Sequence, residues 1–275
     1  MHNLAGKKSR TLLVLGIKCT ISWHPFADEI ILYTDSLQTF EKLQKHIHSL
    51  LNTNHFHLDW YQDKKYAKYF SEILGNFQVS TSELFHEMET QHLEYYFEGS
   101  PTQEHVSIQG KLSGYFRDNS KFYTIQNLYM KRAEFIGKDV LRFFKGKSAI
   151  LENCYLFEYQ IIEFLEKWIS NEAFNNLEFL LATPDSSFDL DREWIVRRFL
   201  VKKFDPSKKW PVYNYKDKST NKNYEFTSSH YLVRDCDGTV ASIGIQNKRF
   251  VFAVWHLNEK QMAEKFYSSE GTSHF

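Results

Sequence analysis

Apolar and polar positions recur with two different periods along the chain, and each period predicts a type of local structure. Residues 39–51 carry apolar side chains at spacings of three and four, which predicts an amphipathic helix that Thr39 can cap. Residues 19–37 are typical of strands, whereas residues 1–18 are compatible with a short helix. From residue 66 to 183, short apolar runs alternate with amphipathic stretches, which predicts an α/β fold.

Three segments look like rough copies of one strand-and-helix unit. They are residues 127–135 with a helical stretch at 138–144, residues 148–156 with one at 158–169, and residues 177–181. Aligning Met130 with Leu151 and Leu180 gives a period in the twenties. Such a period is typical of leucine-rich repeats, in which each unit is buried only against its neighbours. We therefore expect an irregular leucine-rich-repeat-like strand–helix array.

The last part of the chain changes character. Residues 203–222 are polar and contain Pro206 and Pro211, which predicts a loop. Three apolar runs follow, at 229–234, 240–246 and 249–256. The first two are separated by Asp237-Gly238, a dipeptide that suits a tight hairpin turn because both positions tolerate a positive φ. These runs predict a C-terminal antiparallel β-meander that closes the array, followed by a tail over residues 261–275.

Composition limits the classes of partner. The 275 residues contain 34 Lys+Arg and 34 Asp+Glu, so the net charge of +0 provides no field for nucleic acid or an anionic membrane. Apolar residues make up 42% of the chain, and the longest apolar run, residues 11–17, is too short to span a bilayer. Cys19, Cys154 and Cys236 are odd in number and far apart, which favours free thiols in an intracellular compartment, cytoplasmic or nuclear. We expect a globular protein with no nucleic-acid and no membrane partner.

Three stretches together carry a resemblance to a known family. They are a strand and helix at 150–169 with a Leu-x-Asn turn at Asn153, a strand at 176–180, and a meander marked by Tyr231, Asp237-Gly238 and Trp255. On these residues the chain resembles the type 2 F-box-associated domain of nematode F-box proteins. The resemblance is clearest over residues 120–256 and implies one domain over residues 19–260.

Proteins of that family carry an F-box before this domain, and the F-box docks on a Skp1-type adaptor of a cullin ubiquitin ligase. Residues 1–18 are similar only to the last F-box helix, through their basic-then-apolar run. A Skp1-type adaptor is therefore an expected partner only if an F-box lies upstream. The resemblance implies non-catalytic recognition of a target protein, as the substrate-binding arm of the ligase. The alternatives are an adaptor-free interaction module and, more remotely, a histidine-cluster metal protein or enzyme.

The sharpest local cluster of metal-ligating side chains is a set of four histidines, His46, His48, His55 and His57. His55 and His57 would share one face of a strand. No cysteine or well-placed carboxylate completes a tetrahedral set around them. We therefore expect no metal, no cofactor and no catalytic residue.

Other short motifs have simple structural interpretations. Residues 146–148 (Gly-Lys-Ser) resemble the end of a phosphate-binding loop, which lies between a strand and a helix. Here they follow a predicted helix and precede a strand, which predicts a tight turn. Asp189, Asp191 and Glu193 suit the first turn of a helix, where carboxylates complement the dipole. The basic stretch with Phe204 and Trp210 is interpreted as a solvated loop.

The repeat copies also suggest where a partner could bind. If Met130 and Leu151 face the core, the side chains that alternate with them face outward. These candidates for protein binding are Tyr129, Lys131, Ile150 and Glu152. In the competing interpretation, the same four side chains cap a sheet that another part of the chain covers.

Overall fold

The computed structural model describes the backbone of four early strands and then residues 81–267, apart from residues 102, 188, 218, 219 and 247. The chain divides into two units, Met1–Asn54 and His55–Phe275. In the first unit, β1 (Lys8–Val14), β2 (Ile17–Trp23) and β3 (Ile30–Tyr33) form an antiparallel sheet. The expected F-box helix remnant over residues 1–18 is thus wrong for Lys8–Val14, where pairing with β2 satisfies the backbone. The helix expected at 39–51 lies outside the described residues.

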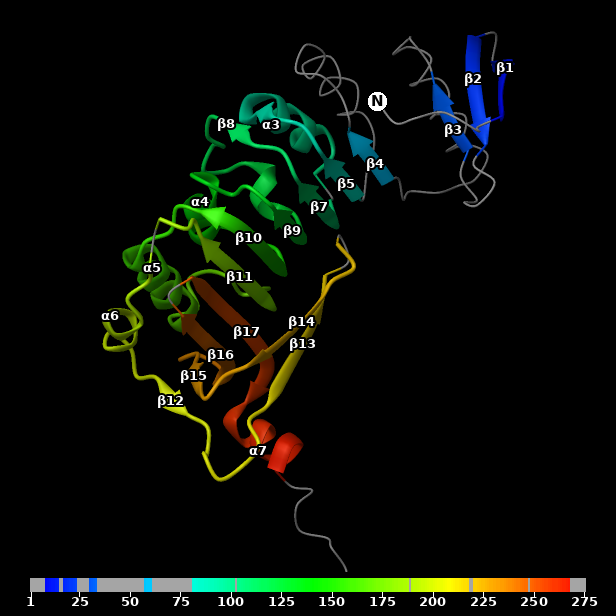
Figure 1. Ribbon diagram of the computed structural model, residues 1–275. Helices are drawn as coiled ribbons and strands as arrows, with labels where there is room; N and C mark the ends of the chain where they lie inside the picture. The colour runs from blue at the N-terminus through cyan, green and yellow to red at the C-terminus, as the bar shows by residue number, and fades with distance from the viewer. Residues whose placement is uncertain are drawn as a thin grey trace, which may run out of the picture. The chain divides into compact units, whose positions relative to one another are not determined.

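The second unit is built on a ten-stranded mixed sheet, which confirms the α/β class (Figure 1). Six strands are parallel neighbours in chain order: β4 (His57–Trp60), β5 (Thr81–Leu84), β7 (His105–Ile108), β9 (Asn127–Met130), β10 (Ser148–Cys154) and β11 (Phe179–Pro184). One row of paired positions crosses all six strands: His57, Thr81, His105, Asn127, Ser148 and Phe179. The number of residues between neighbours in this row is nearly even from β4 to β10 and larger from β10 to β11. Met130 pairs with Leu151 as expected, but Leu151 pairs with Ala182 rather than Leu180.

Four antiparallel strands complete the sheet: β17 (Arg249–Asn258) beside β11, then β16 (Thr239–Gln246), β15 (His230–Val233) and the short β12 (Lys202–Lys203). The predicted meander is therefore confirmed as β15–β17. Gly238 has φ +72 in the turn before β16, as the Asp237-Gly238 dipeptide predicts. A separate short pair is formed by β6 (Met88–Glu89) and β8 (Leu112–Ser113).

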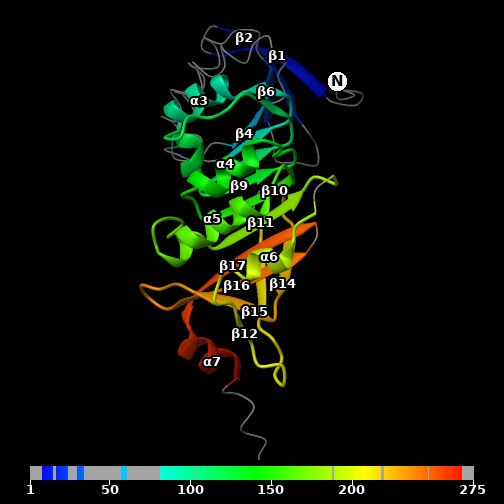
Figure 2. The ribbon, with the colours of Figure 1, turned by 90° about the vertical axis from the view of Figure 1, so that its left-hand side faces the viewer.

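Helices cover one face of the sheet, as Figures 1 and 2 show. They are α3 (Thr90–Gly99), the 3₁₀ turn η2 (Lys121–Thr124), α4 (Ile136–Phe143) and α5 (Glu158–Ile169), with the short α6 (Arg192–Val196) further along. The core lies between these helices and the strands. Trp168 of α5 is fully buried with its ring centroid 4.9 Å from that of Phe252 in β17. None of the described helices is long and apolar enough to cross a membrane.

Two segments differ from the prediction. The polar stretch at 203–222 is not a simple loop, because it contains β13 (Val212–Lys216), which pairs with β14 (Asn223–Thr227) as a hairpin. The expected tail at 261–275 is also wrong at its start, because Glu259–Tyr267 forms α7. Met262 of α7 is buried against Phe204 and Val240, and this packing stabilises the helix.

Candidate functional site

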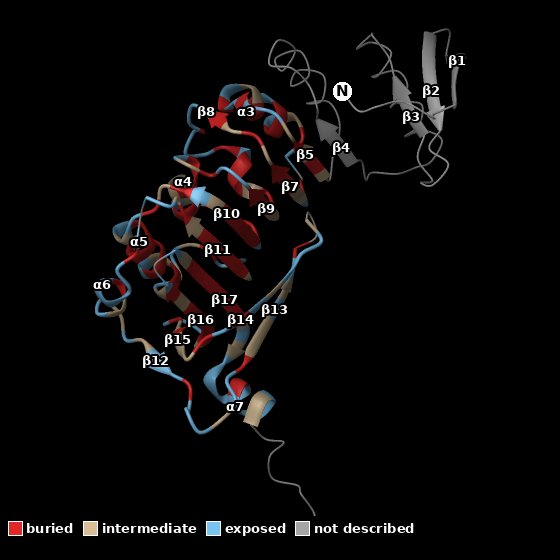
Figure 3. Ribbon diagram, viewed as in Figure 1, coloured by how far each residue is buried: buried red, intermediate tan, exposed pale blue. Residues whose placement is uncertain are grey.

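The two faces of the parallel strands follow the predicted alternation. Met130 and Leu151 are fully buried on the face that packs against the helices. Tyr129 and Ile150 point to the opposite face, but they are only 3% and 1% exposed. Their role as exposed binding residues is therefore wrong, because the β13–β14 hairpin covers this part of the sheet (Figure 3).

Aromatic packing holds the hairpin against the sheet. Tyr213, Tyr215 and Tyr224 pack on a buried cluster that includes Phe179 of β11. The ring centroids of Tyr215 and Phe179 are 4.5 Å apart in a stacked arrangement. The burial of these rings raises the pKa of Tyr215 to about 12, so its phenol stays neutral over the physiological range. The competing interpretation of a covered sheet thus describes this region.

Lys131 and Glu152 lie closer to the edge of the covered region. Lys131 is exposed, whereas Glu152 is half-buried and accepts a hydrogen bond from the Tyr129 hydroxyl group at 3.1 Å. Burial, followed by the Glu152 carboxylate, raises the pKa of Tyr129 well above its usual value. Of the four predicted residues, only Lys131 therefore presents a freely accessible side chain.

Exposed aromatic side chains gather just beyond the carboxyl ends of β9 and β10. Phe135, Phe157 and Tyr159 are 50%, 39% and 56% exposed. The ring of Phe135 meets that of Tyr155 edge-on at 4.6 Å, and the rings of Phe157 and Tyr159 stack at 6.0 Å. A backbone bridge between Glu134 and Cys154 sets the two loops side by side. We call these four side chains the strand-end aromatic cluster.

Two of these aromatic residues occupy positions that local rules assign to other residue types. Phe135 is the N-cap of α4 and Phe157 is the N-cap of α5, and neither side chain accepts a capping hydrogen bond. Serine, threonine, aspartate and asparagine are favoured at this position because their oxygen atoms accept from the first turn. At Phe157 the Gln160 side chain still accepts from the backbone N–H at 2.8 Å, but neither phenylalanine side chain satisfies a donor of the first turn, and both leave apolar surface in water. Such repeated departures from local rules are expected at functional sites.

Basic and acidic groups surround the strand-end aromatic cluster. The Lys111 ammonium lies 2.8 Å from Glu134, and the Arg132 guanidinium lies 3.6 Å from the same carboxylate. Lys131 is exposed one residue before Arg132. Carboxylates are also present, because Glu158 stands between Phe157 and Tyr159 and the backbone N–H of Asp185 donates to the Cys154 carbonyl, so the surroundings are mixed in charge.

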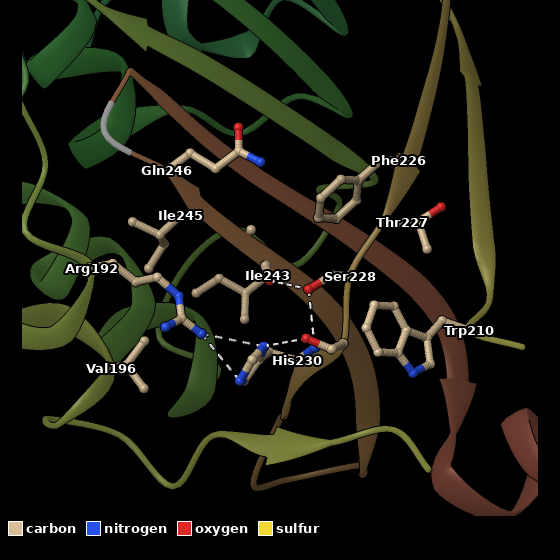
Figure 4. Close-up of a pocket in the computed structure, with 12 residues that line it drawn as sticks. Arg192, Val196, Trp210, Phe226, Thr227, Ser228, His230, Ile243, Ile245 and Gln246 are labelled. Carbon is tan, nitrogen blue, oxygen red and sulfur yellow. Dashed lines mark hydrogen bonds between the residues drawn. The ribbon is translucent and has the colours of Figure 1, made fainter. Parts of the chain in front are cut away.

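A polar pocket of about 220 Å³ lies where β14 leaves the hairpin and enters β15. Figure 4 shows Arg192 on one side, Trp210 on the other, and His230 with Ser228 between them. Ser228 is buried, and its hydroxyl group donates to the Ile243 carbonyl at 2.6 Å while accepting from the backbone N–H of His230 at 3.0 Å.

The pocket contains a serine–histidine contact beside Arg192. One Arg192 guanidinium nitrogen lies 3.2 Å from His230 Nε2 and 3.5 Å from Nδ1, so the guanidinium packs over the imidazole ring instead of in line with one nitrogen lone pair. Nδ1 lies 2.7 Å from Ser229 Oγ, and either group can be the donor in this contact. A catalytic triad also needs a carboxylate behind the histidine, and no carboxylate is among the described residues that line the pocket. Burial, then Arg192 and Lys203, lower the pKa of His230.

Several sequence candidates have structural roles. Asp191 caps α6 by accepting from the Trp194 N–H at 3.0 Å, which confirms a charged helix start in a helix shorter than expected. The turn at residues 146–148 is confirmed between α4 and β10. Among the basic residues, Lys202 pairs with Glu259 at 2.8 Å, and the aromatic Phe204 beside them is buried.

The histidine cluster lies largely outside the described residues. His57 lies in β4, and the other three histidines fall outside the described residues. No group of three potential ligands that could hold a metal ion occurs in the described part of the chain.

The sequence analysis missed both the strand-end aromatic cluster and the polar pocket. Phe135 and Phe157 could have been found, because each immediately precedes a predicted helix where a polar cap is usual. The pocket has no comparable signal, since Arg192 and His230 are far apart in the sequence and only the fold brings them together.

No family model, curated protein or solved structure matches this chain.

Proposed function

We propose that the chain is a non-catalytic protein-recognition domain and that its contact surface is the strand-end aromatic cluster. The observation that carries this proposal is the pair of exposed phenylalanines, Phe135 and Phe157, at N-cap positions of consecutive helices. Aromatic side chains supply large contact areas and are enriched at the energetic centres of protein interfaces. Lys131 lies on the same side and adds a positive charge at the rim.

The order of the strands supports a leucine-rich-repeat-like interpretation of the array. Parallel strands that recur at a nearly even step from β4 to β10 place the loop after each strand along one edge of the sheet. Side chains of neighbouring loops then lie side by side, as Phe135 and Tyr155 do with their ring centroids 4.6 Å apart. An interaction surface built from repeated loops suits an extended partner segment.

The resemblance to nematode F-box-associated domains supports a more specific proposal, that the partner is the target of a ubiquitin ligase. Co-expression of the chain with a Skp1-type adaptor, followed by gel filtration, tests this proposal. Co-elution at one-to-one would support a ligase receptor. Separate elution of the folded chain would favour an adaptor-free interaction module.

The recognition surface is tested by quantitative capture of partners from cell extract with matched variants. Phe157→Ser combined with Tyr159→Ser removes half of the cluster without touching the core, and Tyr95→Ser removes an equally exposed aromatic ring from α3. We expect the double variant to lose the proteins that the unmodified chain captures and Tyr95→Ser to keep them. Equal capture by all three proteins would refute the assignment of this surface.

A further inference from the structure

The polar pocket at the foot of the hairpin has an unusual charge composition. Its walls carry Arg192, His230, two serines, Thr227 and Gln246, but no carboxylate. Lys203 adds a second positive charge that acts on His230. The nearest sequence neighbours with negative charge are otherwise engaged, since Asp191 caps α6 and Glu193 pairs with Arg197 at 2.8 Å. The pocket is therefore a positively charged recess in a chain of zero net charge.

Arg192 makes no ion pair with any residue that the structure describes. Its guanidinium instead lies against the neutral imidazole of His230, which compensates none of its charge. In contrast, Arg197 on the next turn is paired with Glu193. An arginine held over a recess without a carboxylate is a typical binding group for an anion, because its planar fork matches the oxygens of phosphate or carboxylate.

The hydroxyl groups at the pocket floor add donors that point in other directions. When both ring nitrogens of His230 carry protons, Nδ1 donates to Ser229 Oγ, 2.7 Å away, and the proton of that hydroxyl group is available to a ligand. Thr227 is exposed beside it and contributes a second hydroxyl group. Arg192, Ser229 and Thr227 therefore offer more donors than the two oxygens of a carboxylate can use. A phosphate group, with three terminal oxygens, uses them more fully.

We infer that this pocket binds a phosphate monoester, with Arg192 and His230 as its charged contacts and Trp210 beside the group that carries the phosphate. The ligand replaces the present contact between Arg192 and His230 and lies between them. Trp210 stands on the opposite wall, where its ring can pack against an organic substituent (Figure 4).

Binding is coupled to protonation of His230. In the free protein, the groups facing His230 are Arg192 from α6, Lys203 from β12 and Ser229 just before its own strand, while β16 contributes only uncharged residues, Ile243 to Gln246. None of these described groups carries a negative charge that would hold a proton on the ring, so the ring is neutral near pH 7. A phosphate dianion at this position favours the imidazolium, which then becomes a second charged donor. Ligand binding near pH 7 therefore takes up a proton.

Titration calorimetry of the full chain with phenyl phosphate, in two buffers of different ionisation enthalpy at pH 7, tests the inference. We expect binding with proton uptake, and affinity at least about tenfold weaker in Arg192→Gln. The matched control is Arg197→Gln, which removes the same charge just after the same helix and is expected to change affinity less than about twofold. His230→Asn is expected to abolish the proton uptake.

Further ligands identify what the pocket binds, and a second variant tests the site if the first does not fold. Benzoate is expected to bind at least about tenfold more weakly than phenyl phosphate. Free O-phosphoserine and a short peptide containing phosphoserine separate a small-molecule source from a protein source, and binding of either supports the pocket. Ser229→Ala removes only one hydroxyl group, so it still tests the site if Arg192→Gln does not fold. No binding of any phosphate ester, equal loss in Arg192→Gln and Arg197→Gln, or equal affinity for benzoate would overturn the inference.

Discussion

The hydroxyl group of Tyr215 lies 2.5 Å from Ser148 Oγ, and this contact joins the β13–β14 hairpin to the first residue of β10. The same hydroxyl-bearing ring stacks on Phe179. Together these contacts explain why the middle of the strand face is buried instead of open to a partner. The proposed recognition surface therefore lies at the ends of the strands, where aromatic side chains are exposed.

Tyr215 is expected to contribute to stability in two separable ways. Tyr215→Phe removes only the hydrogen bond and should lower the free energy of unfolding by about 1 kcal/mol. Tyr215→Ala also removes the stacked ring and should lower it by about 3 kcal/mol. Asn214→Ala changes an exposed neighbour on the same strand and is the control. Denaturant titration measures all three, and equal stability of Tyr215→Ala and Asn214→Ala would show that the hairpin is not packed on the sheet.

Gly244 gives the hairpin room to approach β16. A Cβ atom at this position would lie 2.6 Å from Cε2 of Phe226, which is itself buried. Gly244→Ala should therefore lower the free energy of unfolding by about 1–3 kcal/mol through overpacking. Gln246→Ala, at an exposed site on the same strand, should change it by less than about 0.5 kcal/mol. Thermal unfolding of both variants checks the difference.

Much of this arrangement could be predicted from the sequence, and the failures have a common cause. The alternation of Tyr129 and Met130 correctly separates two faces, because strand period depends only on local geometry. Whether a face is covered depends on a segment far along the chain, since Tyr213 and Tyr215 come from the hairpin. Tyr213 and Tyr215 alternate with the polar Asn214, which is a strand pattern, but the polar residues around them and Pro211 predict a loop.

The candidate sites show the same limit. Phe135 and Phe157 break a local rule, so single-sequence reasoning could have flagged them. Arg192 and His230 break none, and their contact exists only because α6 lies against the start of β15. Local propensity predicts elements, whereas sites that combine distant elements require the fold.

Asp237 should make stability depend on acid pH. Hydrogen bonds from Arg234, then from the Thr239 N–H, hold the pKa of Asp237 well below its usual value. A lowered pKa means that the stabilisation is present above about pH 4 and is lost as the pH falls through the folded pKa. The effect is moderated by solvent, because the Asp237 side chain is 44% exposed.

The corresponding variant is Asp237→Asn. It leaves the buried Arg234 without its carboxylate over the Trp168 ring, and we expect a loss of about 2 kcal/mol at pH 7. The variant should also lose part of the stability difference between pH 6 and pH 3. Asp235→Asn, two residues earlier and exposed, is the control. Identical acid profiles for Asp237→Asn and the unmodified chain would contradict this role.

The described thiols should differ strongly in reactivity. Cys154 is buried, which raises the pKa of its thiol to about 12, whereas Cys236 is exposed in the turn before β16. In a Cys19→Ser background, an aromatic disulfide reagent should label one thiol in the native protein and the second only after unfolding. Rapid labelling of two thiols under native conditions would contradict the burial of Cys154.

The most direct test of the central claim measures how a captured partner binds after two side chains of the strand-end aromatic cluster are replaced. The partner's binding to the Phe157→Ser/Tyr159→Ser double variant is compared with its binding to Tyr95→Ser by calorimetry, with unfolding curves to verify both folds. The account predicts that affinity falls at least about 100-fold in the double variant and stays within about twofold in Tyr95→Ser. Unchanged affinity in the folded double variant would contradict recognition at this surface.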